Sequence, residues 1–109
     1  MKKSSNDLFK RVYAVVAEIP YGKVTTYGTI AEVCGISSSP RTVGWAMNKA
    51  PEGLPCHRVI NKTGILTGRV YFGDPDLMKE LLIAEGVEFT GDGRVNMKKH
   101  LWIPKSEDI

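Results

Sequence analysis

The sequence predicts one small domain of the α+β class, with helices in its first half and short β-hairpins in its second. Its 109 residues suffice for one hydrophobic core and leave no room for a second domain. A hydrophobic content of 42% and a charged content of 25% are ordinary for a globular chain. Apolar residues recur at helical spacing up to Lys49, whereas short β-prone pieces and turns follow Pro55. We expect a single domain over residues 1–109, with loose tails at 1–6 and 105–109.

The first helix is predicted from a stripe of apolar residues. Asn6 or Asp7 can cap its beginning. The apolar residues that repeat every three or four positions are Leu8, Val12, Val15, Val16 and Ile19. Pro20 and Gly22 end the helix, and residues 23–25 then form a short β-prone piece.

Two short helices separated by a tight turn come next. Thr26 can cap a helix that ends before Gly35, because glycine is common just after a helix. A serine followed by Pro40 is a typical helix start, and this third helix should run to about Lys49. The outline is that of a helix-turn-helix, although any pair of antiparallel helices gives a similar pattern.

The second half of the chain alternates β-prone pieces, turns and one further helix. We expect two β-hairpins, whose paired segments are 57–60 with 64–67 and 87–89 with 94–97. Between them, a fourth helix should begin at Asp74 and Pro75 and run to Ala84 or Glu85.

Charge is unevenly distributed, although the net charge is only +3. Residues 36–69 carry five basic side chains against the single acid Glu52, and residues 74–88 carry five acidic side chains against the single base Lys79. A basic middle indicates a polyanionic partner on one face of the domain. Charge alone is also compatible with an ordinary dipolar surface.

Cysteine and histidine are too few and too widely spaced for a metal site. The chain contains Cys34, Cys56, His57 and His100, without CxxC or HxxxH spacing, so we expect no metal and no other cofactor. Two thiols form no disulfide framework and suit a reducing cytoplasm. No apolar run reaches the roughly 20 residues of a membrane helix, and no signal peptide is evident. We therefore expect a cytoplasmic monomer without a membrane partner.

The segment 55–60 carries the candidate chemistry, because it places the thiol of Cys56 beside the imidazole of His57. Cysteine attacks as the thiolate, and its ordinary pKa is about 8.5, so a working cysteine needs a base or a cation nearby. His57 and Arg58 follow it directly. Neighbouring residues on a strand point to opposite faces, so a small buried cysteine beside a surface histidine is the alternative.

Four blocks in this order resemble the O6-alkylguanine-DNA alkyltransferases and their shorter relatives, the alkyltransferase-like proteins. The blocks are residues 19–28 (IPYGKVTTYG), 41–47 (RTVGWAM), 55–60 (PCHRVI) and 81–87 (LLIAEGV). The resemblance extends from about Leu8 to Trp102. It implies a winged-helix-like domain whose helix-turn-helix binds double-stranded DNA and rotates an O6-alkylguanine into a pocket. Flipping is needed because a side chain cannot reach the reacting atom inside the base stack.

The resemblance also implies roles for individual residues. Cys56 would accept the alkyl group irreversibly, while His57 takes the thiol proton through a water and Glu85 orients the imidazole. Arg41 would enter the duplex and fill the gap left by the extruded base, and Tyr27 would help to turn the nucleotide. The further DNA contacts expected are Ser37, Ser38, Ser39, Thr42, Trp45 and Arg58. The lesion pocket is expected to be lined by Pro55, Val59, Arg69 and Tyr27.

Two features separate the possible activities within this resemblance. Alkyltransferase-like proteins usually carry tryptophan at the position of Cys56, so the cysteine favours a single-turnover transferase. The short chain and Arg69, where the enzymes usually have tyrosine, favour a non-enzymatic sensor that flags the lesion for another pathway such as nucleotide excision repair. We favour transfer to Cys56 and keep the sensor as the alternative. A helix-turn-helix transcription regulator is the third interpretation, and a cysteine hydrolase ranks last because no oxyanion element is evident.

Overall fold

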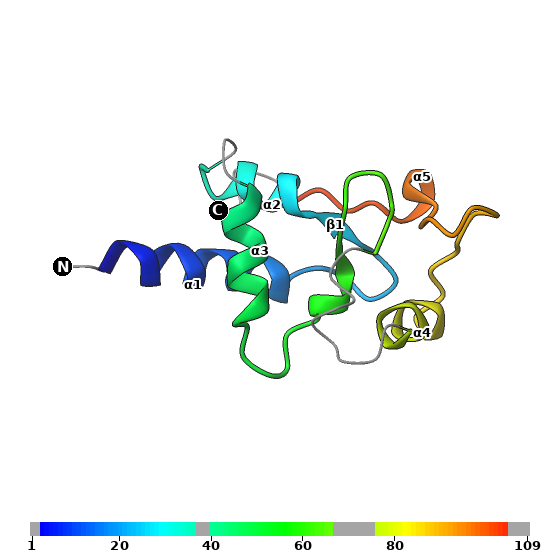
Figure 1. Ribbon diagram of the computed structural model, residues 1–109, viewed down its shortest axis with the longest axis horizontal. Helices are drawn as coiled ribbons and strands as arrows, with labels where there is room; N and C mark the ends of the chain where they lie inside the picture. The colour runs from blue at the N-terminus through cyan, green and yellow to red at the C-terminus, as the bar shows by residue number, and fades with distance from the viewer. Residues whose placement is uncertain (1–2, 37–39, 67–75, 105–109) are drawn as a thin grey trace.

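A computed structural model describes residues 3–36, 40–66 and 76–104 of the chain. Three helices occupy one side of the molecule, and a short parallel pair of strands lies between them and the other side (Figure 1). The predicted tail at 105–109 lies outside the described residues. None of the helices in the described ranges is both long and apolar enough to span a bilayer.

Helix α1 is longer than the sequence pattern predicted. It spans Lys3–Ala17, so residues 3–6 belong to the helix and its beginning precedes the expected caps at Asn6 or Asp7. The predicted apolar stripe faces inward: Val12 and Val16 are completely buried, and Ile19 is buried just beyond the helix end. The prediction from capping residues therefore placed the start of this helix too late, whereas the spacing of its apolar residues identified the buried face correctly.

Helices α2 and α3 confirm the predicted pair. Helix α2 spans Tyr27–Val33, and the hydroxyl of Thr26 caps it by accepting a hydrogen bond from the Thr29 amide at 3.0 Å. Gly35 follows with φ +80°, the left-handed conformation in which glycine commonly ends a helix. Helix α3 spans Pro40–Asn48, and its predicted serine cap lies outside the described residues.

The three helices enclose the first of two apolar cores. Buried side chains of α1, α2 and α3 meet there with one residue of the second strand. These residues are Val12, Val15, Val16, Ile19, Ile30, Ala31, Cys34, Val43, Ala46, Met47 and Val59. Helices α2 and α3 are thus packed against α1 through this core.

In the first predicted hairpin the Asn61 amide donates to the Ile65 carbonyl at 3.1 Å, but the described residues of its two segments form no strand pair. Strand β2, Val59–Ile60, pairs in parallel with β1, Thr25–Thr26, and the preceding residues Cys56–Arg58 form the 3₁₀ helix η1. The turn itself exists, because the Gly64 amide donates to the Asn61 carbonyl at 2.9 Å. Both residues of β2 are buried, as is typical of a strand covered on two faces rather than of a surface hairpin.

The second predicted hairpin is confirmed, and a short helix follows it. Phe89 and Val95 form an antiparallel bridge, and the Thr90 amide donates to the Arg94 carbonyl at 2.7 Å. Helix α5, Met97–His100, was not predicted, and Met97 belongs to it rather than to the hairpin. Beyond α5 the chain forms a parallel bridge between Leu101 and Val24, directly before β1.

Helix α4 and this hairpin surround the second core. Helix α4 spans Leu77–Ala84, and its predicted beginning at Asp74 and Pro75 lies outside the described residues. The buried residues of the second core are Val24, Ile60, Leu66, Met78, Leu82, Val87 and Val95. Since Val59 belongs to the first core and Ile60 to the second, strand β2 connects the two.

Candidate active site and nucleic-acid interface

The thiol of Cys56 lies at the beginning of η1, immediately after Pro55. The Cys56 amide donates to the Leu54 carbonyl at 2.8 Å, which tightens the chain as it enters this turn. The side chain is half-buried and packs against the first core. Burial raises the pKa of the Cys56 thiol. The neutral thiol is therefore favoured, and forming the thiolate requires a base.

His57 contacts Glu85, although 28 residues separate them in the sequence. The His57 Nε2 atom lies 2.6 Å from Glu85 Oε2, and the two side chains are only 15% and 9% exposed. An ionised carboxylate can only accept hydrogen bonds, so Nε2 of His57 is the donor. The other ring nitrogen, Nδ1, is then the atom that can accept a proton.

Arg58 holds the same carboxylate with two parallel hydrogen bonds. Its Nε lies 2.9 Å from Glu85 Oε1 and its Nη2 lies 2.8 Å from Oε2, the bidentate arrangement in which arginine pairs best with a carboxylate. Its third nitrogen, Nη1, donates to the Ile19 carbonyl at 2.8 Å, and the guanidinium lies 5.7 Å from the ring centre of Tyr21. Arg58 thus joins the end of α4 to the segment after α1.

The backbone of Gly22 completes this set, which we call the Glu85 cluster: Gly22, His57, Arg58 and Glu85. The Gly22 amide donates to Glu85 Oε1 at 3.1 Å. Burial on its own would raise the pKa of Glu85, but the hydrogen bonds from Arg58, His57 and Gly22 outweigh it and lower the pKa to about 2. The carboxylate is therefore ionised at neutral pH and can stabilise a positive charge on His57.

Arg58 was expected to contact DNA, and the structure turns it inward instead. Its side chain is 15% exposed, and all three guanidinium nitrogens donate to groups within the protein. A strand through residues 57–60 would have placed Arg58 on the face opposite His57, whereas η1 lets both side chains reach Glu85. The prediction did not include Gly22; its position in the turn before a β-prone piece gave no signal of a contact with Glu85.

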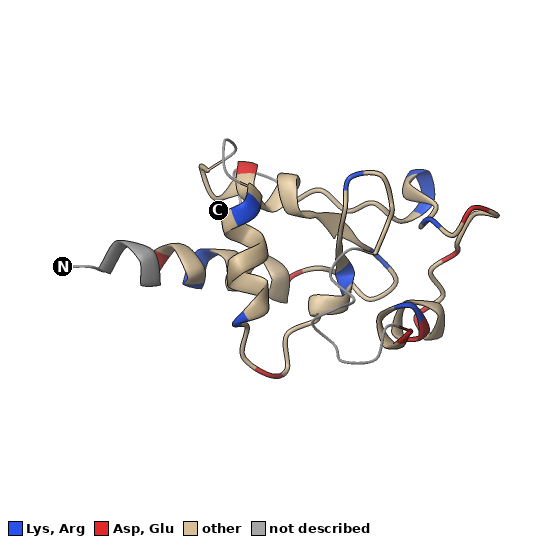
Figure 2. Cartoon of the chain, in the orientation of Figure 1, with Lys and Arg blue, Asp and Glu red and all other residues tan. Residues whose placement is uncertain are grey.

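The expected DNA-binding residues of the described ranges lie on or beside the helix pair. Arg41 is exposed on the first turn of α3, Trp45 is 57% exposed one turn later, and Thr42 is half-buried between them. Tyr27 begins α2, where it is half-buried against the first core. Ser37, Ser38 and Ser39 lie outside the described residues. Figure 2 shows acidic residues on α4 and the segment after it, and others on α1, on α2 and on the loop that follows α3.

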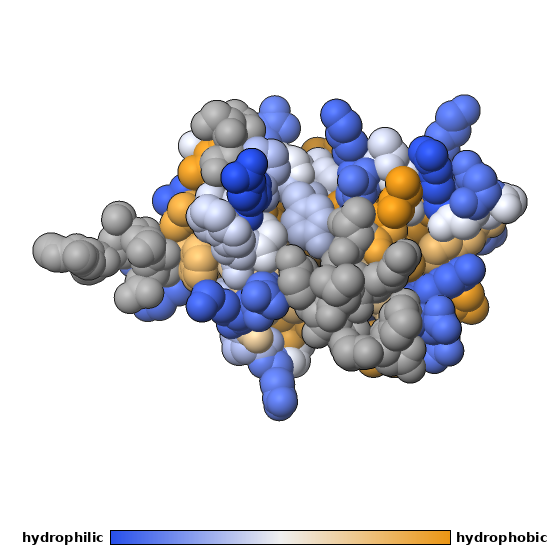
Figure 3. Space-filling view, in the orientation of Figure 1, coloured by the Kyte–Doolittle hydropathy of each residue, from blue (hydrophilic) through white to orange (hydrophobic). Residues whose placement is uncertain are grey.

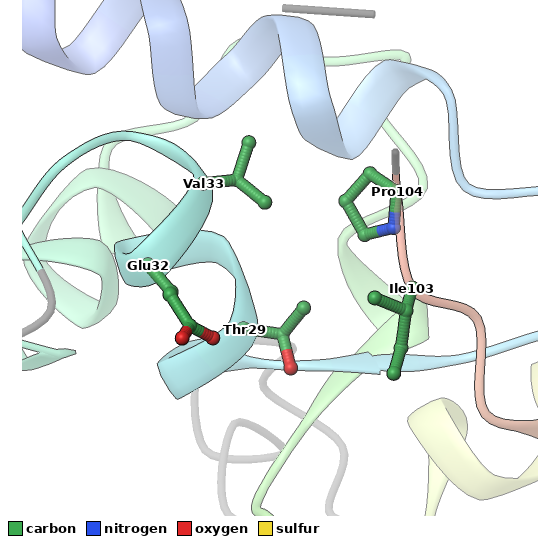
Figure 4. A pocket seen from close by; sticks show the side chains of 5 residues that line it. All are labelled: Thr29, Glu32, Val33, Ile103 and Pro104. Atoms are coloured by element: carbon green, nitrogen blue, oxygen red, sulfur yellow. The ribbon is translucent and has the colours of Figure 1, made fainter. Parts of the chain in front are cut away.

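The residues expected to line a lesion pocket are not all surface residues. Pro55 is half-buried, but Val59 is 1% exposed and belongs to the first core, and Arg69 lies outside the described residues. On the face that Figure 3 shows, apolar areas are separated by hydrophilic side chains. A hollow of about 280 Å³ lies elsewhere, between α2 and the C-terminal segment (Figure 4). It is lined by Thr29, Glu32, Val33, Ile103 and Pro104.

The described part of the chain offers no cluster of metal ligands. There, no three or more His, Cys, Asp or Glu side chains lie close enough together to hold a metal ion. Both cysteines are free thiols. The described site brings together an imidazole and an ionised carboxylate, and the thiol of Cys56 precedes the imidazole in the chain.

Comparison with known proteins relates this chain to one family. Residues 7–87 match the sequence model of the family described as 6-O-methylguanine DNA methyltransferase, DNA binding domain. The chain is 41% identical over 108 residues to the DNA base-flipping protein of Escherichia coli K12, a match covering 93% of this chain and 79% of that protein.

Solved structures agree with this match. Schizosaccharomyces pombe Atl1, in complex with damaged DNA containing O6-carboxymethylguanine, superposes with a TM-score of 0.78 and 39% identity, covering 91% of this chain and 97% of that one. Mycobacterium tuberculosis OGT in complex with DNA gives a TM-score of 0.66 and 40% identity, covering 72% of this chain and 49% of that one. The predicted fold class is confirmed by these likenesses.

Proposed function

The chain belongs to the family of 6-O-methylguanine DNA methyltransferase DNA-binding domains, and on that premise we propose that it repairs O6-alkylguanine in duplex DNA by transferring the alkyl group to Cys56. The observation that carries this proposal is the contact between His57, the residue that follows Cys56 in the chain, and Glu85. An imidazole fixed by a carboxylate next to a nucleophile is the usual means of activating a cysteine.

The reaction needs the duplex to release the alkylated base first. Arg41 and Trp45 present exposed side chains on α3, the helix that a helix-turn-helix places against DNA. Atl1 and OGT were both solved in complex with DNA, which supports DNA binding by this chain. We propose that Arg41 fills the space of the extruded base and that Tyr27 assists its rotation, because a base in the stack is inaccessible to the thiol.

Transfer then proceeds by a balanced displacement. The thiol proton of Cys56 passes through a water to Nδ1 of His57, and Glu85 stabilises the imidazolium that forms. The thiolate attacks the alkyl carbon, the bond between that carbon and guanine O6 breaks, and its electron pair remains on the guanine. The proton held by His57 can neutralise the guanine anion. Because the thioether is stable, each molecule of protein acts once.

Intact mass spectrometry tests the transfer. The protein is mixed with a duplex containing one O6-methylguanine, and its mass should rise by one methylene group. The gain should vanish in Cys56→Ser. It should persist in Cys34→Ala, a matched control, because Cys34 is 2% exposed within the first core and lies outside the Glu85 cluster. An unchanged wild-type mass would refute transfer.

A lesion sensor is the second candidate, and two observations favour it. Burial raises the pKa of Cys56, which disfavours the thiolate, and the chain is 39% identical to Atl1 over 91% of its length. A sensor would prefer O6-methylguanine DNA in a gel shift without gaining mass, and we would then expect a partner from another pathway such as nucleotide excision repair. Binding governed by base sequence alone would indicate a transcription regulator instead.

The proposal also covers the oligomeric state and the cellular compartment of the protein. We propose a single domain that acts as a monomer in the cytoplasm. The compartment is supported by two free thiols, which suit a reducing environment. Equilibrium sedimentation of the free protein and of its DNA complex tests the monomer, since a dimer would add a second protein mass in either sample.

A further inference from the structure

We propose that His100 is a positioning residue for the Glu85 cluster, acting through the peptide groups of Gly22. This inference rests on the proposed function, since it adds a residue to the same site. His100 belongs to α5, the helix that the sequence did not predict, and its side chain is 6% exposed. Its ring touches neither Cys56 nor His57 in the hydrogen bonds that the structure describes, so any effect must pass through an intermediate group.

The ring of His100 is held between two backbone groups of known polarity. Its Nδ1 lies 3.0 Å from the Gly22 carbonyl, and its Nε2 lies 3.0 Å from the Glu88 amide. A carbonyl can only accept and an amide can only donate, so Nδ1 carries the proton and Nε2 accepts. The imidazole is therefore neutral, with one defined tautomer.

Gly22 connects this histidine to the carboxylate. Its carbonyl accepts from His100, and its amide donates to Glu85 Oε1 at 3.1 Å. The residue has φ +81°, and a Cβ atom built there would lie 3.2 Å from the Glu85 carbonyl oxygen. Glycine is needed because the conformation is left-handed and the turn lies against the end of α4.

His100 fixes the distance between the turn at Gly22 and the chain that follows α4. A rigid ring joins Gly22 to Glu88, and Glu85 lies three residues before Glu88 in that same segment. The backbone of His100 is also attached, because the Val24 amide donates to its carbonyl at 2.9 Å. The Gly22 amide is consequently held opposite Glu85, where it fixes one of the two carboxylate oxygens.

Other contacts of this turn are more exposed. The hydroxyl of Tyr21 donates to the Ala84 carbonyl at 3.2 Å, and Lys23 Nζ donates to the Lys99 carbonyl at 3.2 Å, both at the surface. Water competes for such bonds, whereas the bonds of a buried ring are protected from it. Of these contacts, the ring of His100 is the one that can set the position of Gly22.

Substitutions can separate the two bonds of the ring. Asparagine at position 100 places an amide near the former Nδ1, so it can still donate to Gly22. Glutamine reaches further, towards the former Nε2, so it can still accept from Glu88. Leucine removes both bonds while keeping an apolar side chain. If Gly22 is the link, His100→Asn should behave like the wild type, whereas His100→Gln and His100→Leu should not.

The first readout is the rate of methyl transfer at saturating DNA. We expect His100→Gln and His100→Leu to be slower by about ten- to a hundredfold, because a reacting group misplaced by up to an ångström loses about that much. Affinity for lesion DNA should stay within about twofold, since α3 is not involved, and His100→Asn should restore the rate. Equal rates in the folded variants would overturn the proposal.

The second readout is nuclear magnetic resonance of the ring nitrogens, which does not depend on transfer. In the wild type, His100 should be protonated on Nδ1 and His57 on Nε2, with the His57 proton shifted downfield by its bond to Glu85. That downfield shift should diminish in His100→Gln and return in His100→Asn. A proton on Nε2 of wild-type His100 would refute the proposal without any variant. If the wild type transfers no methyl group, only the proposed transfer fails, and the His57 signal still tests His100.

Discussion

Two arginines of this molecule have opposite surroundings, and the contrast separates its binding surface from its reactive site. Arg41 is exposed on α3, above the first core. Arg58 is 15% exposed, and its guanidinium nitrogens donate to Glu85 and to the Ile19 carbonyl. An exposed cation contributes little to folding and remains available to a phosphate or a base, whereas a buried cation is committed to its partner. Stability and DNA affinity should therefore depend on different residues.

The largest effect should follow from Glu85→Gln, which removes the charge that pairs with Arg58 and fixes His57. An unpaired, mostly buried guanidinium should lower the free energy of unfolding by about 3 kcal/mol. Transfer to Cys56 should slow by about a hundredfold or more, because His57 loses its orienting carboxylate. Urea unfolding followed by circular dichroism measures the first effect, and single-turnover kinetics measure the second.

Glu88→Gln is the matched control for this substitution. Glu88 also pairs with a cation, Lys99, at 2.6 Å, but both side chains are more than half exposed. Ion pairs of this kind contribute little, so stability and transfer should be unchanged. Equal destabilisation by Glu85→Gln and Glu88→Gln would mean that burial of the Glu85 cluster has no energetic consequence.

Lowering the pH should remove the contribution of the Glu85 charge to the free energy of unfolding without a mutation. The pKa of Glu85 is lowered from its ordinary 4.5 to about 2 in the folded chain, so the folded state binds fewer protons than the unfolded state between these values. Its contribution, about 3 kcal/mol, is present above about pH 4.5 and is lost as the pH falls towards 2. Denaturant unfolding from about pH 6 down to about pH 2 should show a steeper loss for the wild type than for Glu85→Gln. If the stabilities of the wild type and Glu85→Gln fell in parallel with pH, the lowered pKa of Glu85 would be contradicted.

The sequence predicted the elements whose determinants are local. Thr26, Gly35 and Pro40 bound α2 and α3 through caps that act within four residues, so both helices were placed correctly. The parallel pairing of β1 with β2 was missed, because nothing in residues 57–67 indicates that a strand 34 positions earlier is a better partner than the neighbouring segment. Pairing across such a distance is decided by burial on both faces.

In the candidate site, too, neighbouring residues were recognised from the sequence pattern, whereas contacts between distant residues were not. Cys56 and His57 are adjacent and were recognisable together, whereas Glu85 was assigned only by resemblance to a family. Arg58 was expected among the DNA contacts, and in the structure its side chain is turned inward from η1. Gly22 takes part through its backbone amide and carbonyl, and a backbone hydrogen bond leaves no trace in the type of residue that accepts or donates it.

The smallest effect on stability, with a selective effect on binding, should come from Arg41→Ala. An exposed residue on α3 should change the free energy of unfolding by less than about 0.5 kcal/mol. If Arg41 occupies the place of the extruded base, affinity for duplex containing O6-methylguanine should fall about tenfold, and affinity for the unmodified duplex should fall less. Fluorescence anisotropy with the two duplexes measures both changes.

Lys49→Ala removes one positive charge beyond the end of α3 and is the control for charge alone. A lysine that only attracts phosphates should weaken binding to both duplexes equally and reduce the salt dependence of the affinity. The ratio of the two affinities should therefore fall in Arg41→Ala and stay constant in Lys49→Ala. Equal losses on both duplexes in Arg41→Ala would reduce that residue to a phosphate contact, and recognition of the lesion would then have to come from the pocket alone.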